Sequence, residues 1–268
     1  MESSPHNSAN ILNIEHPCTA SDLAQEIPVA ISVNDISHAV MMLTPIDLEY
    51  FAIGFAYSEG IIDHYSDLRD LDIYQHNVAL QQGEGFQLPA YNIAIKISPR
   101  QSIRYKKQHS FRQGLTGCGI CGTAALDAAI PDLNSLPHSA LPPKKQLLHL
   151  PNTLFSLQKL KGVHAALLLS PEGEVVTCHE DIGRHNALDK TIGFALKNNI
   201  QLNGFSILMS SRCSVELIQK AVKAKLSTLI HISSPSHLAT QMAHHYNLNL
   251  IQITRKGELK TFSQPPIL

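Results

Sequence analysis

The chain has 268 residues, of which 44% are hydrophobic, and a formal net charge of -1. These values indicate one large or two modest folded domains, and they exclude a global electrostatic case for nucleic-acid or membrane binding. No apolar run approaches the roughly 20 residues of a membrane span, and residues 1–6 lack the apolar core of a signal peptide. Five cysteines, an odd number, are typical of a reducing compartment, so we expect a cytoplasmic protein.

The first 100 residues predict a small sheet with one helix. Four stretches have the composition and alternation of strands. They are residues 27–33, 39–43, 71–74 and 91–97. After the second stretch, Thr44 is expected to cap a helix whose first position is Pro45, and Gly60 is expected to end that helix.

Residues 114–122 carry the clearest chemistry, because they contain Cys118 and Cys121 in a C-x-x-C spacing among glycines. Glycine tolerates positive φ and offers no side chain to bury, so this stretch predicts an accessible loop. A helix-forming run begins at Thr123, which places Cys121 just before a helix N-terminus. A thiolate is favoured at such a position.

The charge near this stretch favours the same chemistry. No Asp or Glu occurs between Phe86 and Leu126, and the segment before the cysteines, interpreted as a basic loop, is rich in cations. They are Lys96, Arg100, Arg104, Lys106, Lys107 and Arg112. Nearby cations stabilise a thiolate and attract an anionic substrate. We therefore hypothesise that Cys118 and Cys121 carry out covalent sulfur chemistry.

The second half has the element order of an α/β domain. The proline-rich residues 136–143 predict an inter-domain connection, so we assign residues 1–135 and 136–268 to two domains. A hairpin within residues 164–178 precedes strands that alternate with helices. The later strands are expected at residues 205–209, 228–232, 248–253 and 259–262, and the helices at 183–197, from 214 and at 236–246. This order predicts a mostly parallel sheet covered by helices on both faces.

Polar turns follow several of these strands, and such turns bind ligands in α/β sheets. In the first, Glu180 and Asp181 could accept hydrogen bonds from a purine or pterin edge, and Arg184 at a helix start could hold a phosphate. A capped helix start with a surface salt bridge is the alternative. Ser211 and Arg212 lie in a second turn suited to an anion, unless the serines only cap a helix beside a solvated Arg. Residues 233–236 form a third.

The C-x-x-C spacing alone leaves alternatives open. A structural zinc site needs four ligands, and no second C-x-x-C is present, so His179 or His185 would have to contribute. A thioredoxin-like site would follow a strand and contain fewer glycines. A flexible loop is better suited to handing sulfur from one protein to another site.

In combination these motifs resemble the FdhD family, the sulfurtransferases required for formate dehydrogenase maturation. The resemblance covers nearly the whole chain and is most specific at Glu180–Lys190 (EDIGRHNALDK). The other matching stretches are 44–45, 52–55, 58–62, 118–122, 162–166, 233–236 and the turn at Arg255.

The resemblance implies a carrier that accepts persulfide sulfur from a cysteine desulfurase and passes it to the molybdenum (or tungsten) bis-guanine-dinucleotide cofactor of formate dehydrogenase. It implies a homodimer without an intrinsic metal, and a second domain similar to the three-layer cytidine-deaminase fold. Cys118 matches the persulfide position, with Cys121 as partner or relay. The guanine-dinucleotide contact maps onto Ile253, Thr254, Arg255, Lys256, Gly257 and Glu258.

The chain departs from the family pattern at three positions. Ser211 stands where Gly is common, His179 where Arg is common, and Glu258 where a basic residue is usual. These changes reduce the positive charge at the expected cofactor pocket and leave both cysteines intact. The alternatives are a zinc-dependent deaminase-like protein, although no H-x-E or P-C-x-x-C pattern is present, and a chaperone that only shelters the cofactor.

Overall fold

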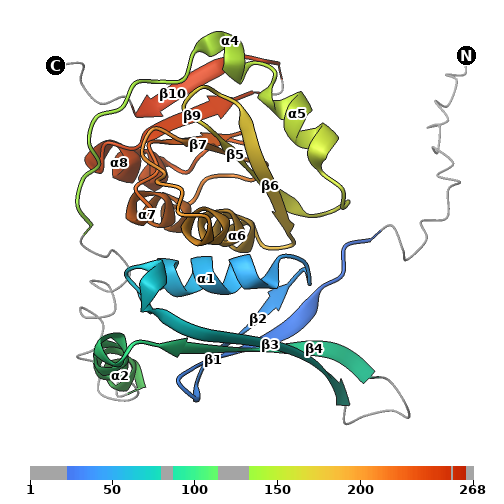
Figure 1. Cartoon of the computed structure of the whole chain (residues 1–268). Coiled ribbons are helices and arrows are strands. Elements are labelled where there is room, and N and C mark those ends of the chain that lie inside the picture. Colours follow the sequence, from blue (N-terminus) through green and yellow to red (C-terminus); the bar gives the residue numbers. More distant parts are fainter. Residues whose placement is uncertain (1–22, 80–86, 114–132, 255, 264–268) are drawn as a thin grey trace, which may run out of the picture.

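The computed structural model describes residues 23–79, 87–113, 133–254 and 256–263. Within these residues the chain forms two sheets with helices between and above them (Figure 1). In the described chain, no helix is both long and apolar enough to cross a membrane.

The first sheet has four strands in the order β2-β1-β4-β3. Its elements are β1 (Ile27–Val33), β2 (Ile36–Leu43), α1 (Leu48–Ser58), the 3-10 helix η2 (Tyr65–Asp67), β3 (Leu68–Ala79), β4 (Gln87–Ile97) and α2 (Pro99–Gln113). Strands β1 and β4 are parallel, and the outer pairs are antiparallel. Alternate residues of β1, including Val29 and Ile31, are buried against Phe51 and Phe55 of α1. The four strands predicted from the sequence are confirmed.

The start of α1 differs from the prediction. The helix begins at Leu48, and its N-cap is Asp47 with a φ of 54°, not Thr44. Thr44 is buried and bonds instead to the second half of the molecule, where its hydroxyl accepts a hydrogen bond from the Ile182 N–H. A tertiary contact therefore replaces the expected local cap.

The basic segment before the cysteines is a helix rather than a loop. At the start of α2 the Ser98 carbonyl oxygen accepts the Ser102 N–H. The Gln101 and Tyr105 side chains lie on the side of the helix that is buried. This periodic burial explains why the segment is helical despite its polar composition.

The second sheet has six strands in the order β10-β9-β8-β7-β5-β6. Its elements are α4 (Lys144–Leu147), α5 (Leu150–Leu157), β5 (His164–Leu169), β6 (Val175–Asp181), α6 (Arg184–Lys197), β7 (Ser206–Met209), α7 (Val215–Lys223), β8 (Thr228–His231), α8 (His237–His245), β9 (Asn249–Ile253) and β10 (Leu259–Ser263). The prediction that this sheet is mostly parallel is wrong. Only β7, β8 and β9 pair in parallel, because the hairpins at both ends and the β5–β7 pair are antiparallel.

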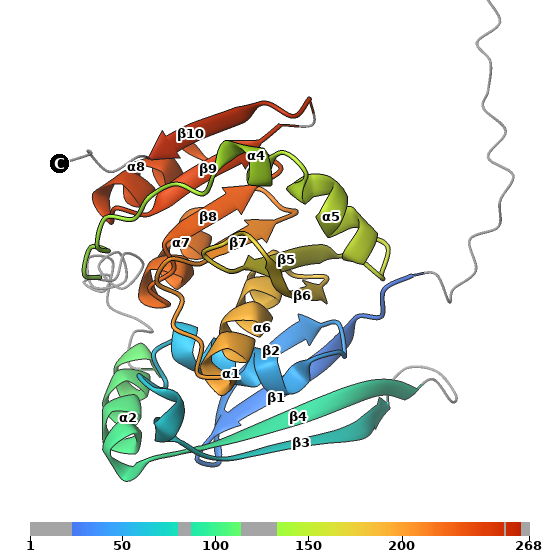
Figure 2. The same cartoon turned by 45° about the horizontal axis from the view of Figure 1, so that its top comes forward.

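The predicted three-layer α/β/α arrangement is confirmed (Figure 2). On one face of the sheet, Leu168 and Leu229 pack with α6, α7 and α8. On the other face, Leu167 and Ile230 pack with Leu150 and the rest of α4 and α5. The sheet is thus buried on both sides.

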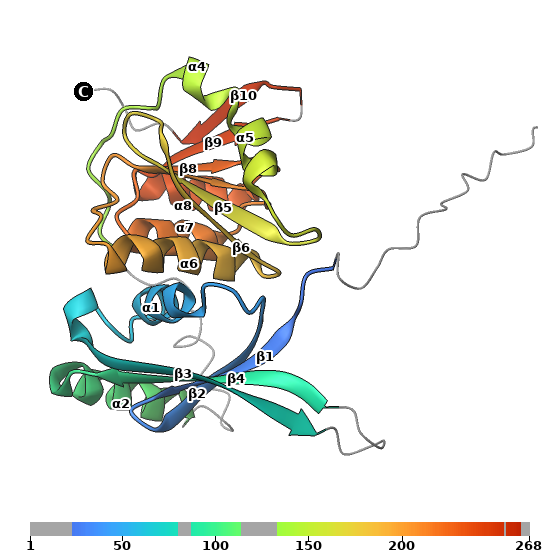
Figure 3. The same ribbon diagram turned by 45° about the vertical axis from the view of Figure 1, so that its right-hand side comes forward.

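The two halves meet where α1 crosses α6 (Figure 3). A Cβ on Gly54 of α1 would lie 1.8 Å from the Asp189 carbonyl oxygen, and one on Gly193 of α6 would lie 1.8 Å from the Tyr50 carbonyl oxygen. Two glycines therefore permit the backbones to approach more closely than any side chain would allow.

Candidate cofactor site and its relation to the cysteines

The three predicted polar turns lie along one edge of the second sheet. Met209 pairs with His231, and His231 pairs with Gln252, so the carboxyl ends of β7, β8 and β9 are level. The predicted turns after β7 and β8, residues 210–214 and 233–236, therefore lie at this edge, as does the turn at 254–258 after β9. The amino end of β5 lies at the same edge, where the Ala165 N–H donates to the Ser210 hydroxyl. The predicted turn that follows β6 lies there too, because Asp181 pairs with His164 at the amino end of β5. All three predicted turns thus lie along one edge, and their ligand-binding role stays a prediction.

Two helices begin at this edge without a side-chain cap. Gly183 and Ser214 are the N-cap residues of α6 and α7, and neither side chain makes a capping bond. Ser236, in contrast, caps α8 by accepting the Ala239 N–H at 3.2 Å. The first-turn N–H groups of α6 are therefore suited to an anionic ligand, whereas at the start of α7 the Glu216 carboxylate already accepts its own backbone N–H.

Arg184 is the cation at the start of α6. Among the residues that the structure describes, it forms no ion pair. Burial and the Arg184 guanidinium lower the pKa of His185 from 6.5 to about 4, and the same causes lower the pKa of His164. Both imidazoles are therefore neutral at pH 7 and add no positive charge beside Arg184.

The turn after β7 holds Ser211 and Arg212 differently. Arg212 is exposed, as a phosphate ligand would be, whereas Ser211 is buried and its hydroxyl donates to the Arg212 carbonyl oxygen. Beneath this turn His231 is fully buried, and its Nδ1 donates to the Ser211 carbonyl oxygen at 3.0 Å. His231 Nε2 has no hydrogen-bond partner among the described residues. Its position inside a strand gave no sequence signal.

The predicted guanine-dinucleotide contact, residues 253–258, is the turn between β9 and β10. The Glu258 carbonyl oxygen accepts the Thr254 N–H, and the Thr254 hydroxyl accepts the Glu258 N–H. Ile253 is completely buried in the core, so only its backbone could reach a ligand. Lys256, Gly257 and Glu258 are exposed, and Arg255 lies outside the described residues. The assignment of this turn stays a prediction.

Glu180 and Asp181 are occupied by bonds within the chain. Glu180 accepts the N–H groups of Lys159 and Leu160 at 2.7 and 2.8 Å. Asp181 is fully buried and accepts the N–H groups of Thr44 and Gly183. A guanine or pterin contact at these carboxylates would require such bonds to open, and that role also stays a prediction.

Lys190, the last residue of the motif Glu180–Lys190, links the two halves of the molecule. Its ammonium group is fully buried, lies 2.7 Å from the Asp181 carboxylate, and donates to the carbonyl oxygens of Thr44 and Glu180. Asn186 donates to Asp181 and to the Met42 carbonyl oxygen. Much of the motif thus faces inward and fixes the turn that presents Arg184. The sequence did not reveal this, because a Lys on a helix is usually solvated.

The cysteines divide into two groups. Cys178 and Cys213 are free thiols whose pKa is raised by burial, to about 11 and about 12. They are therefore poor nucleophiles near neutral pH. Cys118 and Cys121 lie outside the described residues, as does the predicted helix from Thr123. The two histidines considered for the zinc alternative are engaged apart from each other, since His179 Nδ1 donates to Asp47 and His185 Nε2 lies 3.4 Å from the Ser214 hydroxyl.

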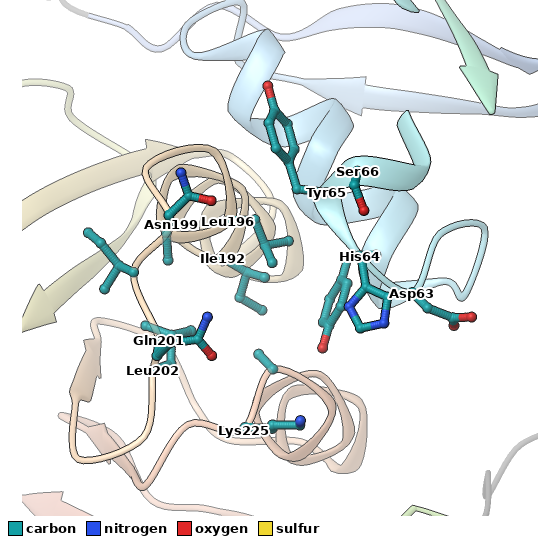
Figure 4. A pocket seen from close by; sticks show the side chains of 14 residues that line it. Asp63, His64, Tyr65, Ser66, Ile192, Leu196, Asn199, Gln201, Leu202 and Lys225 are labelled. Carbon is teal, nitrogen blue, oxygen red and sulfur yellow. The ribbon is translucent and has the colours of Figure 1, made fainter. Parts of the chain in front are cut away.

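A cavity of about 620 Å³ lies at the other end of α6 (Figure 4). Its apolar part includes Ile192 and Leu196, and its polar part includes His64, Gln201 and Lys225. None of the predicted site residues that the structure describes lines it. The carboxyl edge of the sheet therefore remains the candidate cofactor site.

Comparison with known proteins decides the family. Residues 24–267 match the model of the FdhD/NarQ family. The chain belongs to the FdhD/NarQ family. It is 35% identical over 248 residues to the sulfur carrier protein FdhD of Acinetobacter baylyi, covering 90% of this chain and 86% of that one. It is 33% identical over 255 residues to the protein of the same name from Bordetella petrii, covering 92% and 87%.

A solved structure agrees on the fold. The crystal structure of a proposed formate dehydrogenase accessory protein from Desulfotalea psychrophila matches with a TM-score of 0.65 and 22% identity. The match covers 92% of this chain and 90% of that one. The family resemblance is confirmed, and the α/β fold is shared with this solved structure.

Proposed function

We propose that this FdhD/NarQ family protein accepts a sulfane sulfur from a cysteine desulfurase and transfers it to the bis-guanine-dinucleotide cofactor destined for formate dehydrogenase. The cofactor is a substrate in this proposal rather than a resident group. The main support is the membership itself, together with the anion-binding geometry at the carboxyl edge of the second sheet. We further propose a cytoplasmic homodimer.

In this proposal, the cysteine pair carries the sulfur and the carboxyl edge of the second sheet binds the cofactor. The Cys118 thiolate attacks the outer sulfur of the donor persulfide, the donor sulfur–sulfur bond breaks, and the donor cysteine leaves as a thiolate. No net oxidation occurs in this exchange, and the sulfane sulfur now resides on Cys118. Cys121 is assigned as the partner or relay of Cys118.

The cofactor phosphates are assigned to Arg184, Arg212 and the first-turn N–H groups of α6. The exposed part of the 254–258 turn is assigned to a guanine dinucleotide. Neutral His164 and His185 flank Arg184 without adding to the positive charge, so the contact depends on the arginine.

Mass spectrometry of the intact protein after incubation with a desulfurase and cysteine tests the sulfur-carrying step. We expect the wild-type chain to gain one sulfur atom that a thiol reductant removes. Cys118→Ala should lose this gain or reduce it at least tenfold, whereas Cys213→Ala should keep it because the buried thiol does not compete. Equal loading of Cys118→Ala and wild type would contradict the assignment.

The two alternatives give different results in the same preparation. A zinc protein would contain stoichiometric zinc that a Cys118→Ala/Cys121→Ala variant loses. A chaperone that only shelters the cofactor would support full formate dehydrogenase maturation with Cys118→Ala in place of the wild type.

A further inference from the structure

The outer face of α2 is a cationic surface that the cofactor site does not use. Figure 1 shows α2 beside the first sheet, at the end of the molecule farthest from α4. Arg100, Lys106 and Lys107 are exposed, and the Ile103 side chain among them is 62% exposed. At 100° per residue, these four positions fall within about 120° of the helix circumference. They form what we call the α2 face.

The opposite side of α2 fixes the helix to the body of the protein. Gln101 donates to the carboxylates of Asp63 and Asp67 at 2.9 and 3.0 Å. Arg104 bonds to Asp63 and donates to the Gly60 carbonyl oxygen. These carboxylates are thereby occupied on the inner side of the helix, and they do not balance the charge of the α2 face.

The charges of the α2 face do not serve the stability of the helix. No acidic residue lies in its first turn, where the helix dipole favours one, and Arg100 lies there instead. Among the described residues, neither Arg100, Lys106 nor Lys107 has an ion-pair partner. A helix that keeps three unpaired cations around an exposed isoleucine is suited to an external partner with acidic and apolar groups.

The position of α2 in the chain limits which kind of protein could bind the α2 face. The last helical residue, Gln113, is five residues before Cys118, a length of chain that spans at most about 17 Å. A protein that brings a persulfide to Cys118 must therefore come close to α2. A neutral or basic donor would gain nothing from this surface, whereas an acidic one would be steered to it.

We propose that the α2 face is the docking surface for an acidic, partly apolar surface of the protein that donates sulfur. This inference rests on the proposed function. A protein is favoured over nucleic acid because the chain as a whole has a net charge of -1 and the centre of the surface is an aliphatic side chain. Docking here adds specificity and association rate to the transfer and leaves its chemistry unchanged.

A matched pair of double variants tests the proposal. Lys106→Glu/Lys107→Glu reverses two charges on the α2 face, and Lys144→Glu/Lys145→Glu reverses two exposed neighbouring lysines on α4 at the far end of the molecule. Sulfur loading is timed by mass spectrometry with two donors, a cysteine desulfurase with cysteine and the small molecule 2-hydroxyethyl persulfide, which has no protein surface to dock. We expect the α2 variant to load about tenfold more slowly from the desulfurase at low salt. Loading from the small persulfide should be unchanged, and the α4 variant should resemble the wild type with both donors.

The outcomes separate the two proposals. Equal desulfurase loading of the α2 and α4 variants overturns the docking surface and leaves sulfur carriage intact. Equal slowing with both donors also overturns it, because the lysines would then act on the cysteine itself. Failure of the wild type to load from either donor overturns the proposed function.

Two further measurements do not depend on the charge-reversed variant folding. Wild-type loading from the desulfurase should slow several-fold between 50 and 500 mM salt. Added salt shortens the Debye length and so screens the attraction between the exposed charges of the two proteins. Ile103→Ser should slow the desulfurase reaction and leave the small-donor reaction unchanged. Salt-independent loading, or selective loss of DNA binding in the α2 variant with normal loading, would overturn the proposal.

Discussion

A buried histidine beneath the candidate cofactor site contributes to the way the protein responds to acid. His231 is fully buried, donates through Nδ1 to the Ser211 carbonyl oxygen and has a pKa lowered by burial from 6.5 to about 4. In the unfolded chain this imidazole binds a proton at a higher pH than in the folded chain. The stability that it contributes is therefore complete above pH 6.5 and is lost as the pH falls toward 4.

Replacing His231 should remove part of this acid sensitivity. Between pH 7 and pH 5 we expect His231 to account for about 2 kcal/mol of the loss in unfolding free energy. His231→Asn keeps a donor for the Ser211 carbonyl and should flatten the pH dependence, measured by urea denaturation across this range. His244→Asn, which changes an exposed imidazole on α8, should not. An unchanged pH slope in His231→Asn would refute this account.

The close packing of α1 against α6 depends on two glycines, which have no side chain at the crossing point. Glycine normally weakens a helix by about 1 kcal/mol relative to alanine. Here Gly54 and Gly193 each lie where a Cβ would meet the backbone of the other helix at 1.8 Å. Contact between the helices, and not helix propensity, accounts for both glycines.

Replacing either glycine by alanine should therefore lower the stability of the protein, although helix propensity alone predicts that it would raise it. We expect Gly193→Ala to destabilise the protein by about 3 kcal/mol or more, because the two backbones must separate. Chemical denaturation gives the magnitude, and a parallel loss in Gly54→Ala would show that the crossing is responsible. A stabilised Gly193→Ala protein would mean that the helices are not this close.

At the scale of the whole molecule, the two halves share one buried polar network. Lys190 on α6 bonds to Thr44, which precedes α1, and to Asp181 at the end of β6. His179 Nδ1 adds a hydrogen bond between the halves by donating to the Asp47 carboxylate at 2.8 Å. Because these groups are satisfied only when both halves are folded together, we expect the described body of the protein to unfold as one unit.

Removing the buried cation tests this coupling. Lys190→Met should lower the unfolding free energy by about 3–5 kcal/mol, because it leaves the Asp181 carboxylate buried without its cation. Lys197→Met, on the same helix, removes only a partly exposed pair with Glu49 and should cost less than about 1 kcal/mol. Calorimetry should show a single transition in the wild type. Two resolved transitions, or equal effects of the two variants, would contradict the shared network.

The amino-acid sequence by itself determined the family, through the resemblance of its motifs. It also determined the three-layer α/β plan of the second half and the polar turns at the ends of β6, β7 and β8, because local periodicity and turn chemistry carry that information. They also indicated the cysteine pair as the place for sulfur chemistry, which remains a prediction outside the described residues.

Only the tertiary structure decided which polar residues face inward. Thr44 became a partner of Ile182 instead of a helix cap, and Lys190 and Asp181 became a buried ion pair that also bonds to Thr44 of the first half. Strand pairing also made the sheet mixed, since β5 lies antiparallel to β7. A buried charge looks the same as a solvated one in the sequence, because its position depends on a partner far away in the chain.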